Sequence, residues 1–264
     1  MMRYTRKRNR LSALSFQLSA ILLLSAGNLL AAEMFWQNTG AGILEPEVKH
    51  VLVHPGQPSL IYSASESTVY LSENSGKDFR SILHIPSSEN PINRLIVFKD
   101  SPEDIYVATE GGVYSSKNRG EAWQKIFQPS EEGAHQSRSI ARFGGTIYIG
   151  TLKGLYYQKN NGFWWEAGGA GITAKPVFFL EAEEQYLYAA TDQKIFRLKK
   201  GDEHWVEKFS TSGVENLVEE EAVVDEEAET TGGQIKALEI VPNGTNQLYT
   251  ATGSGIFHSA DNGE

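Results

Sequence analysis

A repeat of about 40 residues runs through most of the chain and constrains its fold more than any other feature. Residues 105–116 (IYVATEGGVYSS) return at 147–158, 187–198 and 248–259, and in looser form at 61–72. Successive copies are offset by 44, 42, 40 and 61 residues. Each copy has two short runs of alternating apolar and aromatic residues around a turn of small residues, which is the pattern of a β-hairpin.

Further apolar runs flank each hairpin and raise the number of strands per repeat to four. One run precedes each hairpin, at 48–54, 92–98, 137–143, 174–180 and 235–241, and another follows, for example at 123–127, 164–167 and 205–209. Four strands in a repeat of about 40 to 50 residues are typical of a β-propeller. The sequence therefore predicts an all-β propeller of four-stranded blades, with about five blades near residues 45–86, 91–128, 137–167, 174–210 and 234–264. The offset of 61 indicates an insertion at 213–233.

Two arrangements of the ring remain open. Residues 36–43 (WQNTGAGI) match 165–172 (WEAGGAGI), which follow a third strand, so the chain is expected to begin with an outer strand. That strand could complete the last blade of a closed ring of five blades, which would remove the sheet edges. Alternatively the chain is the front part of a longer ring, such as one of seven blades. The last residue, Glu264, falls two positions before an expected aromatic, which favours the longer ring.

A turn motif recurs between the third and fourth strands: Ser, any residue, Asn or Asp, any residue, Gly, two of any kind, and an aromatic residue. Its members are Ser72, Asn74, Gly76 and Phe79; Ser116, Asn118, Gly120 and Trp123; Asn160, Gly162 and Trp165; and Ser259, Asp261 and Gly263. Asn, Asp and Ser side chains bond to nearby backbone N–H groups, glycine supplies a positive φ, and the aromatic ring fills the space between sheets. We therefore expect these residues to be structural and to take no part in catalysis or metal binding.

This motif resembles the Asp-box, or bacterial neuraminidase repeat, of sialidases, sortilin-type receptors, xyloglucanase-type hydrolases and photosystem II assembly factor propellers. The resemblance covers residues 35–264. It implies the propeller fold and says little about function, because in those families the motif is a structural turn away from the ligand face.

The first 32 residues have the order of a secretory signal peptide. Arg3, Arg6, Lys7, Arg8 and Arg10 precede an apolar stretch that is densest at 20–24, and small residues lead up to Ala32. Cleavage after Ala32 would release residues 33–264, whereas an uncleaved segment would be an N-terminal membrane anchor. The chain has no cysteine, which fits a bacterial periplasm or exterior better than a eukaryotic secretory route. We expect a periplasmic or secreted protein.

Charge and residue spacing exclude several kinds of partner. The net charge is −9 with the N-terminal segment and −14 for residues 33–264, which hold 19 basic and 33 acidic side chains. So acidic a surface repels phosphate backbones, and nucleic acid is therefore not an expected partner. The six histidines have no metal-binding spacing, and no cofactor is expected.

Ligands of propellers usually bind to the loops that join second to third strands and one blade to the next. These loops supply the candidate binding residues Glu66, Glu110, His135, Arg138, Lys153 and Asp192. His135 with Arg138 is the densest polar pair for recognising an anion. The alternative is that these charges belong to ordinary solvated turns. The insertion carries eight acidic residues within 215–229 and is expected to be a solvated excursion on the same face.

The sequence motifs give little indication of an enzyme. A sialidase needs an arginine cluster, and the aromatic-Arg-Ile-Pro element of that family is absent, with only Phe79 to Ile82 as a partial echo. Xyloglucanase-type enzymes place two carboxylates between two propellers, and this chain encodes at most one propeller. The basic patch expected of assembly factors also fits poorly with a charge of −14. The sequence predicts an exported, non-catalytic propeller that binds a protein or glycan as a scaffold or assembly factor; the alternative is a glycoside hydrolase of the sialidase or xyloglucanase type.

Overall fold

The computed structural model describes residues 38–86, 90–159, 162–169, 171–213, 233–241 and 246–264. All strands formed by these residues lie in the compact unit Thr39–Glu264. The first two sheets contain β1 (His50–Val53), β2 (Ile61–Ala64), β3 (Thr68–Ser72) and β4 (Arg80–His84), then β5 (Ile92–Phe98), β6 (Ser101–Thr109), β7 (Gly112–Ser116) and β8 (Gln124–Phe127). The next two contain β9 (Ser137–Phe143), β10 (Thr146–Thr151), β11 (Gly154–Lys159) and β12 (Trp164–Glu166), then β13 (Phe179–Ala182), β14 (Tyr186–Ala190), β15 (Lys194–Lys199) and β16 (Val206–Ser210). A short 3-10 helix, η1 (Thr211–Gly213), precedes β17 (Ile235–Ile240), β18 (Leu248–Thr252) and β19 (Gly255–Ser259).

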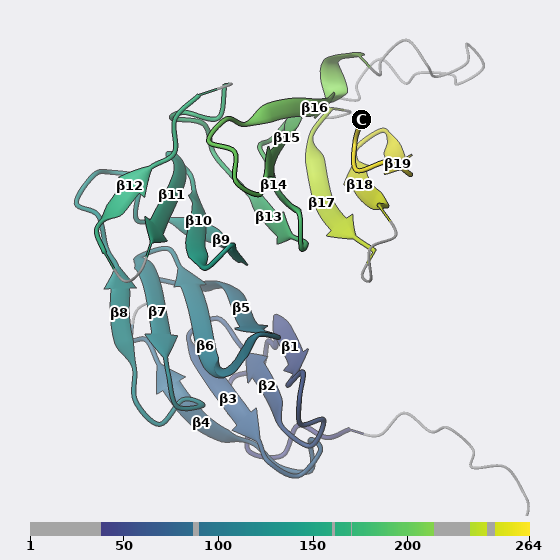
Figure 1. Cartoon of the computed structure of the whole chain (residues 1–264). Coiled ribbons are helices and arrows are strands. Elements are labelled where there is room, and N and C mark those ends of the chain that lie inside the picture. The colour runs from purple at the N-terminus through teal and green to yellow at the C-terminus, as the bar shows by residue number, and fades with distance from the viewer. Residues whose placement is uncertain (1–37, 87–89, 160–161, 170, 214–232, 242–245) are drawn as a thin grey trace, which may run out of the picture. The chain divides into compact units, whose positions relative to one another are not determined.

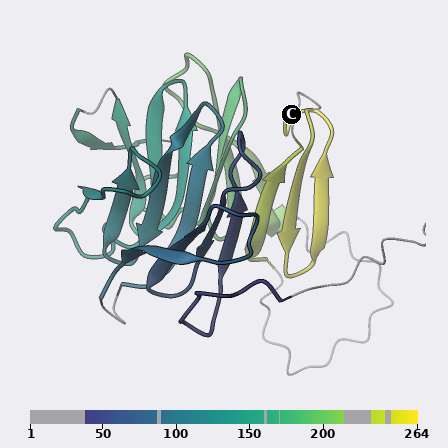
Figure 2. The same ribbon diagram turned by 90° about the horizontal axis from the view of Figure 1, so that it is seen from below.

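Each sheet is an antiparallel meander in which strands pair in the order of the chain (Figures 1 and 2). Four sheets have four strands, and the described part of the fifth has three. The five sheets fall within the five residue ranges expected for the blades. This architecture confirms the all-β propeller of four-stranded blades predicted from the repeat.

The first strands of successive sheets lie next to one another. Contacts join β1 to β5, β5 to β9, β9 to β13, and β13 to β17. Because the first strand of each blade faces the axis of a propeller, these contacts identify the inner surface of the molecule. Side chains from blades that are not neighbours can therefore meet there, however distant they are in the sequence.

One first strand differs from its expected range. The run at 174–180 was expected to form it, yet β13 begins at Phe179 and ends at Ala182. Pro176 has no backbone N–H to donate to a strand ladder, and Ala174 has a φ of 53°, which a strand does not accommodate. The residues before Phe179 therefore form the loop that enters the blade.

Apolar cores fill the spaces between successive sheets. Tyr62 and Val107 belong to the core between the first and second sheets, Ile140 and Ile149 to the next, and Phe196 to the third. A fourth core joins the last two sheets. Each inner sheet is thus buried on both faces, which removes its apolar side chains from water and provides the main driving force for packing.

Tryptophans tie each of two blades to the blade before it. The indole Nε1 of Trp123 donates to the carbonyl oxygen of Ile82 at 2.8 Å, and that of Trp164 donates to the carbonyl oxygen of Ile126 at 2.9 Å. The Trp164 ring also meets Phe127 edge-on, with centroids 4.9 Å apart. Each indole therefore combines apolar packing with a polar bond across the blade boundary.

The assignment of Trp165 as the core aromatic of the third blade is wrong. Trp165 is 59% exposed, and its neighbour Trp164 takes the inner position. β12 begins with Trp164 opposite Gln158, so the turn of this blade is one residue shorter than that of the second blade, where Trp123 lies seven positions after Ser116. Because side chains alternate along a strand, this shift exchanges the two tryptophans.

The N-terminal part of the described chain packs on the first sheet. Of the outer strand expected at 36–43, residues 36 and 37 lie outside the described residues, and residues 38–49 contain no strand. The sequence match between 36–43 and 165–172 corresponds to the same kind of turn in both segments. Ile43 donates its N–H to the Gly40 oxygen, and Ile172 donates its N–H to the Gly169 oxygen, both at 3.1 Å. The Ala41 oxygen accepts the N–H of Phe79 at 2.8 Å. The described residues of this segment therefore add no strand to β19.

The two adjacent tryptophans provide a test of blade coupling. We expect Trp164→Phe to lower the free energy of unfolding by about 1 to 2 kcal/mol, because it removes the indole donor and leaves the Ile126 carbonyl unpaired. Trp165→Phe is the matched control and should change it by less than about 0.5 kcal/mol, since that ring is exposed. Urea denaturation measures both. An equal effect of the two substitutions would contradict the assignment.

Candidate functional site

Turns of one kind join second to third strands and bring the predicted loop residues to the same strand ends. In each turn a hydroxyl accepts or donates the bonds that close it: Thr109 Oγ1 donates to the Gly112 oxygen and Thr151 Oγ1 to the Gly154 oxygen, both at 2.9 Å. Glu66, Glu110, Lys153 and Asp192 lie in these turns, and His135 and Arg138 lie at the entry to β9. We call this set of turns and entry loops the loop face.

Glu110 and Arg138 form the centre of a network between the second and third sheets. Arg138 Nη1 lies 2.6 Å from Glu110 Oε1 and donates to Asn93 Oδ1 at 3.3 Å. Asn93 Nδ2 in turn donates to Glu110 Oε1 at 3.1 Å and to the Ser137 oxygen at 2.9 Å. The network is half-buried and holds three side chains from two blades in one fixed arrangement.

The pairing of His135 with Arg138 as an anion site is not what the structure shows. Arg138 is already paired with Glu110, while His135 Nδ1 lies 3.3 Å from the backbone oxygen of Glu131. Lys153 pairs with the Glu131 carboxylate at 2.5 Å. These contacts leave no charge excess on this part of the loop face for an anion.

The remaining candidates are more isolated. Glu66 lies 3.7 Å from Lys49 at the first blade. Asp192 is exposed, and its backbone oxygen accepts the N–H of Ile235 at 2.7 Å. Neither residue joins the network around Arg138. The expected acidic insertion cannot be placed, since residues 214–232 lie outside the described residues.

A cavity of about 220 Å³ lies beside this network, on the inner surface of four blades. Its polar lining comes from the first strands: Asn93 and Arg94 on β5, Arg138 and Ser139 on β9, Glu181 on β13 and Glu239 on β17. Arg94 Nη2 lies 3.5 Å from Glu181 Oε1, which joins the second blade to the fourth. The cavity is therefore lined by side chains of four different blades.

The environment of Glu181 raises the pKa of its carboxyl to about 7. Burial is the main cause, the nearby charge of Glu239 adds to it, and Arg94 opposes both. A carboxyl whose pKa is shifted to near neutral pH and that lines a cavity is a candidate functional residue. Arg94, Glu181 and Glu239 were not among the expected site residues, because those lie in loops; the signal for them in the sequence is a charged side chain on the first strand of a blade.

The carboxylate of Glu45 fastens the N-terminal segment to the loop face of the first blade. It accepts bonds from Ser65 Oγ at 2.5 Å and from Ser67 Oγ at 2.7 Å, and from the hydroxyl of Thr68. Although partial burial acts in the opposite direction, these donors lower the pKa of Glu45 to about 2. The repeat does not indicate this contact, because Glu45 precedes its first apolar run at 48–54.

The Ser-x-Asn/Asp-x-Gly turns lie at the strand ends opposite the loop face. In two of them the serine hydroxyl bonds to the Asn side chain and accepts the glycine N–H: Gly76 donates to Ser72 Oγ at 2.9 Å and Gly120 to Ser116 Oγ at 2.8 Å. Ser259, Asp261 and Gly263 repeat this pattern. Asn160 lies outside the described residues, and Gln158 Nε2 donates to the Gly162 oxygen at 2.6 Å. The polar atoms of these turns are used in holding the turn together.

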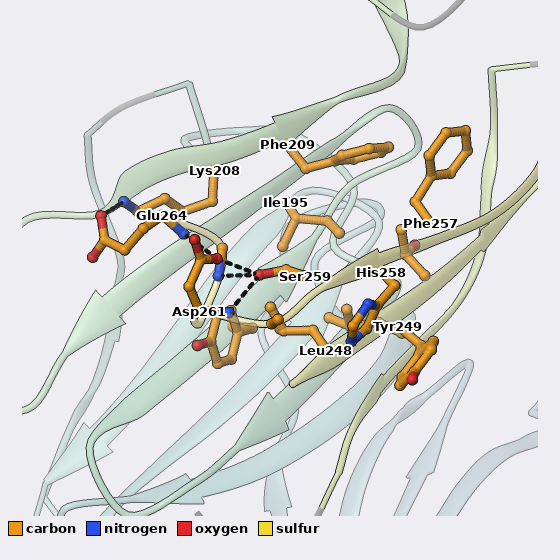
Figure 3. Close-up of a pocket in the computed structure, with 15 residues that line it drawn as sticks. Ile195, Lys208, Phe209, Leu248, Tyr249, Phe257, His258, Ser259, Asp261 and Glu264 are labelled. Atoms are coloured by element: carbon orange, nitrogen blue, oxygen red, sulfur yellow. Dashed lines mark hydrogen bonds and ion pairs between the residues drawn. The ribbon is translucent and has the colours of Figure 1, made fainter. Parts of the chain in front are cut away.

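A second hollow of about 400 Å³ lies between the last two sheets (Figure 3). Ile195, Leu248, Phe209 and Phe257 line it, and the two phenylalanine rings are 5.4 Å apart. Gly263 lies against Lys208, on the fourth strand of the preceding blade, and Gly120 lies against Ile82 on the corresponding strand. In the second blade Trp123 also packs at this place, so the hollow corresponds to the position of that ring. We assign it to packing between blades.

Two further findings concern the described residues alone. No helix among them is long and apolar enough to cross a membrane. Nor do they contain a group of three or more His, Cys, Asp or Glu side chains placed to hold a metal ion. The expected signal peptide, residues 1–32, lies outside this part of the chain.

Comparisons with known proteins show the fold alone. No family model matches the chain, and no curated protein matches it by sequence. Among solved structures, the GH74 xyloglucanase from Xanthomonas campestris has a TM-score of 0.58 at 17% identity, over 81% of this chain and 36% of its own. The extracellular domain of a hybrid two-component system from B. thetaiotaomicron has a TM-score of 0.57 at 13% identity, over 84% and 30%. YCF48 from Cyanidioschyzon merolae has a TM-score of 0.50 at 12% identity, over 78% and 64%.

These neighbours are β-propellers of both enzymatic and other kinds, and the chain spans less than two thirds of each of the three. The comparisons therefore support the propeller scaffold and leave its activity to be inferred from the site.

The raised pKa of Glu181 predicts how stability depends on pH. In the folded chain this carboxyl stays protonated up to about pH 7, whereas in the unfolded chain it ionises near 4.5. Its contribution is fully present below pH 4.5 and is lost as pH rises through 7, at a cost of about 3 kcal/mol at most. Glu181→Gln should therefore be more stable than the original chain at pH 8 and similar to it at pH 4.5.

Chemical denaturation across this pH range measures the effect, with Glu184→Gln as the control on an exposed residue. A Glu181→Gln profile parallel to that of the original chain would show that Glu181 titrates normally.

Proposed function

We propose that this protein is an exported, non-catalytic β-propeller that binds a protein or a carbohydrate ligand on its loop face. The observation that carries the proposal is the network of Glu110, Arg138 and Asn93, with the cavity beside it. Its charged groups are paired across blades and held by hydrogen bonds, which gives a fixed mixed-charge surface suited to recognition. The order of residues 1–32 supports export to a bacterial periplasm or exterior.

The resemblance of the turn motif to the Asp-box belongs to the same proposal, as does a role as scaffold or assembly factor. An acidic surface still argues against nucleic acid as a partner, and contact with a membrane would require an uncleaved N-terminal segment.

Glycoside hydrolysis is the second candidate, and Glu181 is the observation that favours it. A carboxyl with a pKa of about 7 has the property required of a general acid, and Glu239 acts on it from the same cavity. Hydrolysis would place the reaction at the axis of the propeller and not in its loops.

One set of measurements separates the two candidates. The full chain is cross-linked to envelope proteins of the organism that encodes it and is also applied to a glycan array. Binding to the protein or glycan so identified should fall at least tenfold in Lys153→Glu. This change replaces the ion pair with Glu131 by two carboxylates that repel each other, and so alters both the charge and the arrangement of the loop face. Lys200→Glu, in the turn between β15 and β16 at the opposite strand ends, is the matched control.

The second arm measures the release of reducing sugar from sialosides and β-glucans. We expect none above background. Hydrolysis that Glu181→Gln abolishes would contradict the non-catalytic proposal, and binding that is insensitive to Lys153→Glu would remove the loop face from it.

A further inference from the structure

A pocket of about 250 Å³ lies between the third and fourth sheets and takes no part in the site described above. Its lining combines aromatic rings, small and apolar side chains and two carboxylates, and includes Tyr148, Tyr157, Ala167, Asp202, Glu203 and Trp205. None of these residues lines the cavity on the first strands, which we call the axial cavity. The pocket is therefore a separate candidate site.

The pocket exists because the third blade has a small residue where other blades have a large one. Ala167 corresponds to Phe127 of the second blade, since each lies opposite the second residue of the third strand. The Phe127 ring fills the space beside Trp164 of the next blade, with ring centroids 4.9 Å apart. Ala167 has no ring, and a space is left beside Trp205.

Three rings form a row on the face of the third sheet that borders this pocket. Tyr157 is paired with Tyr148 on one side and with Trp165 on the other, so their side chains lie on the same face. The two tyrosine rings are stacked with centroids 5.9 Å apart. Tyr148 is buried, Tyr157 is half-buried and Trp165 is 59% exposed. The row therefore runs from the core to the surface, where ring faces are accessible.

Blade packing does not account for the two outer rings of this row. The positions of Tyr157 and Trp165 are taken in the other four-stranded blades by pairs that contain no aromatic residue: Leu71 and Arg80, Ser115 and Gln124, and Arg197 and Val206. The fold thus accepts many side chains at this place. An accessible aromatic pair beside a pocket is then a feature of the third blade that a ligand would explain.

Two carboxylates give the pocket a negative charge. Asp202 and Glu203 lie in the turn between β15 and β16, both are exposed, and within the described part of the chain neither forms an ion pair. Lys199 and Lys200 precede them but do not line the pocket. Residues 33–264 as a whole hold 19 basic and 33 acidic side chains. Ring faces beside carboxylates attract a cation and disfavour an anion.

Among cations, a guanidinium group fits these surroundings best. It is planar and weakly hydrated, it stacks on aromatic faces, and its N–H groups match the geometry of carboxylate oxygens. An ammonium group is a compact and strongly hydrated charge that gains less from a flat ring.

We propose that this pocket binds an arginine side chain of a partner protein, with the guanidinium group against the rings of Tyr157 and Trp165 and beside the carboxylates of Asp202 and Glu203. The inference goes beyond the proposed function, because the turn between β15 and β16 lies at the strand ends opposite the loop face. It adds a second contact surface at the boundary of the third and fourth blades.

Titration of the isotope-labelled full chain, followed by the indole N–H resonances of Trp165 and Trp205, tests the inference. The probe is the peptide acetyl-Gly-Gly-Arg-Gly-Gly-amide, and the same peptide with citrulline in place of arginine is its neutral counterpart of similar shape. We expect the arginine peptide to shift both resonances in a saturable way. The citrulline peptide should bind about tenfold more weakly or not at all, because it lacks the charge.

Variants of exposed residues locate the binding site without disturbing the core. Asp202→Asn combined with Glu203→Gln should weaken binding of the arginine peptide about fivefold or more, and Trp165→Ala about threefold or more. Glu121→Gln is the matched control, because Glu121 is exposed and precedes Trp123 by two positions, as Glu203 precedes Trp205. It should change the affinity less than about twofold.

Several outcomes would overturn the inference. Equal binding of the two peptides would exclude recognition of the charge, and binding that neither variant weakens would place the site elsewhere. A shift of the Trp165 resonance with cellotetraose and none with the arginine peptide would assign the rings to a saccharide. A shift on dilution of the chain alone would assign them to a second copy. The loop-face measurement with Lys153→Glu is independent of this test, so either proposal can fail while the other stands.

Discussion

The burial of every inner sheet between two neighbours is the constraint on which the rest of this structure depends. A four-stranded meander with apolar side chains on both faces cannot cover them by itself, and the repeat supplies the cover by placing a similar sheet on each side. Trp123 and Trp164 make this packing specific in orientation, because each indole N–H donates a hydrogen bond to a carbonyl of the preceding blade. The packing therefore fixes the order and the orientation of successive blades.

The axial cavity is a consequence of the same constraint. Once the blades are packed, their first strands are neighbours, and residues far apart in the sequence come together without any loop to guide them. Arg94 and Glu181 are 87 positions apart and lie 3.5 Å from each other. Burial by the surrounding strands also acts on the Glu181 carboxyl and shifts its pKa. The chemistry of this site is thus produced by the fold and not by a local motif.

Most of the fold could be predicted from the sequence because it depends on local patterns. Alternation predicts the hairpins, and the recurrence of the motif predicts the blades. The errors arose where one residue decides the outcome: a turn shortened by one residue exchanged Trp164 and Trp165, and Pro176 moved the start of β13. The site was less accessible, because only the contact of first strands shows that Arg94, Glu181 and Glu239 face a common cavity. Similarly, the pairing of Arg138 with Glu110 crosses a blade boundary, which no spacing rule describes.

The central claim is that the ligand of the proposed function binds at the axial cavity and the loop face around it. Amide chemical-shift mapping of the labelled chain, with the bound glycan or protein added, tests it most directly. The account predicts the largest changes at Asn93, Arg94, Ser139 and Glu181, on three different first strands, and smaller ones in the neighbouring loops. Changes confined to the turns at 72–79 and 116–123, at the opposite strand ends, would contradict it.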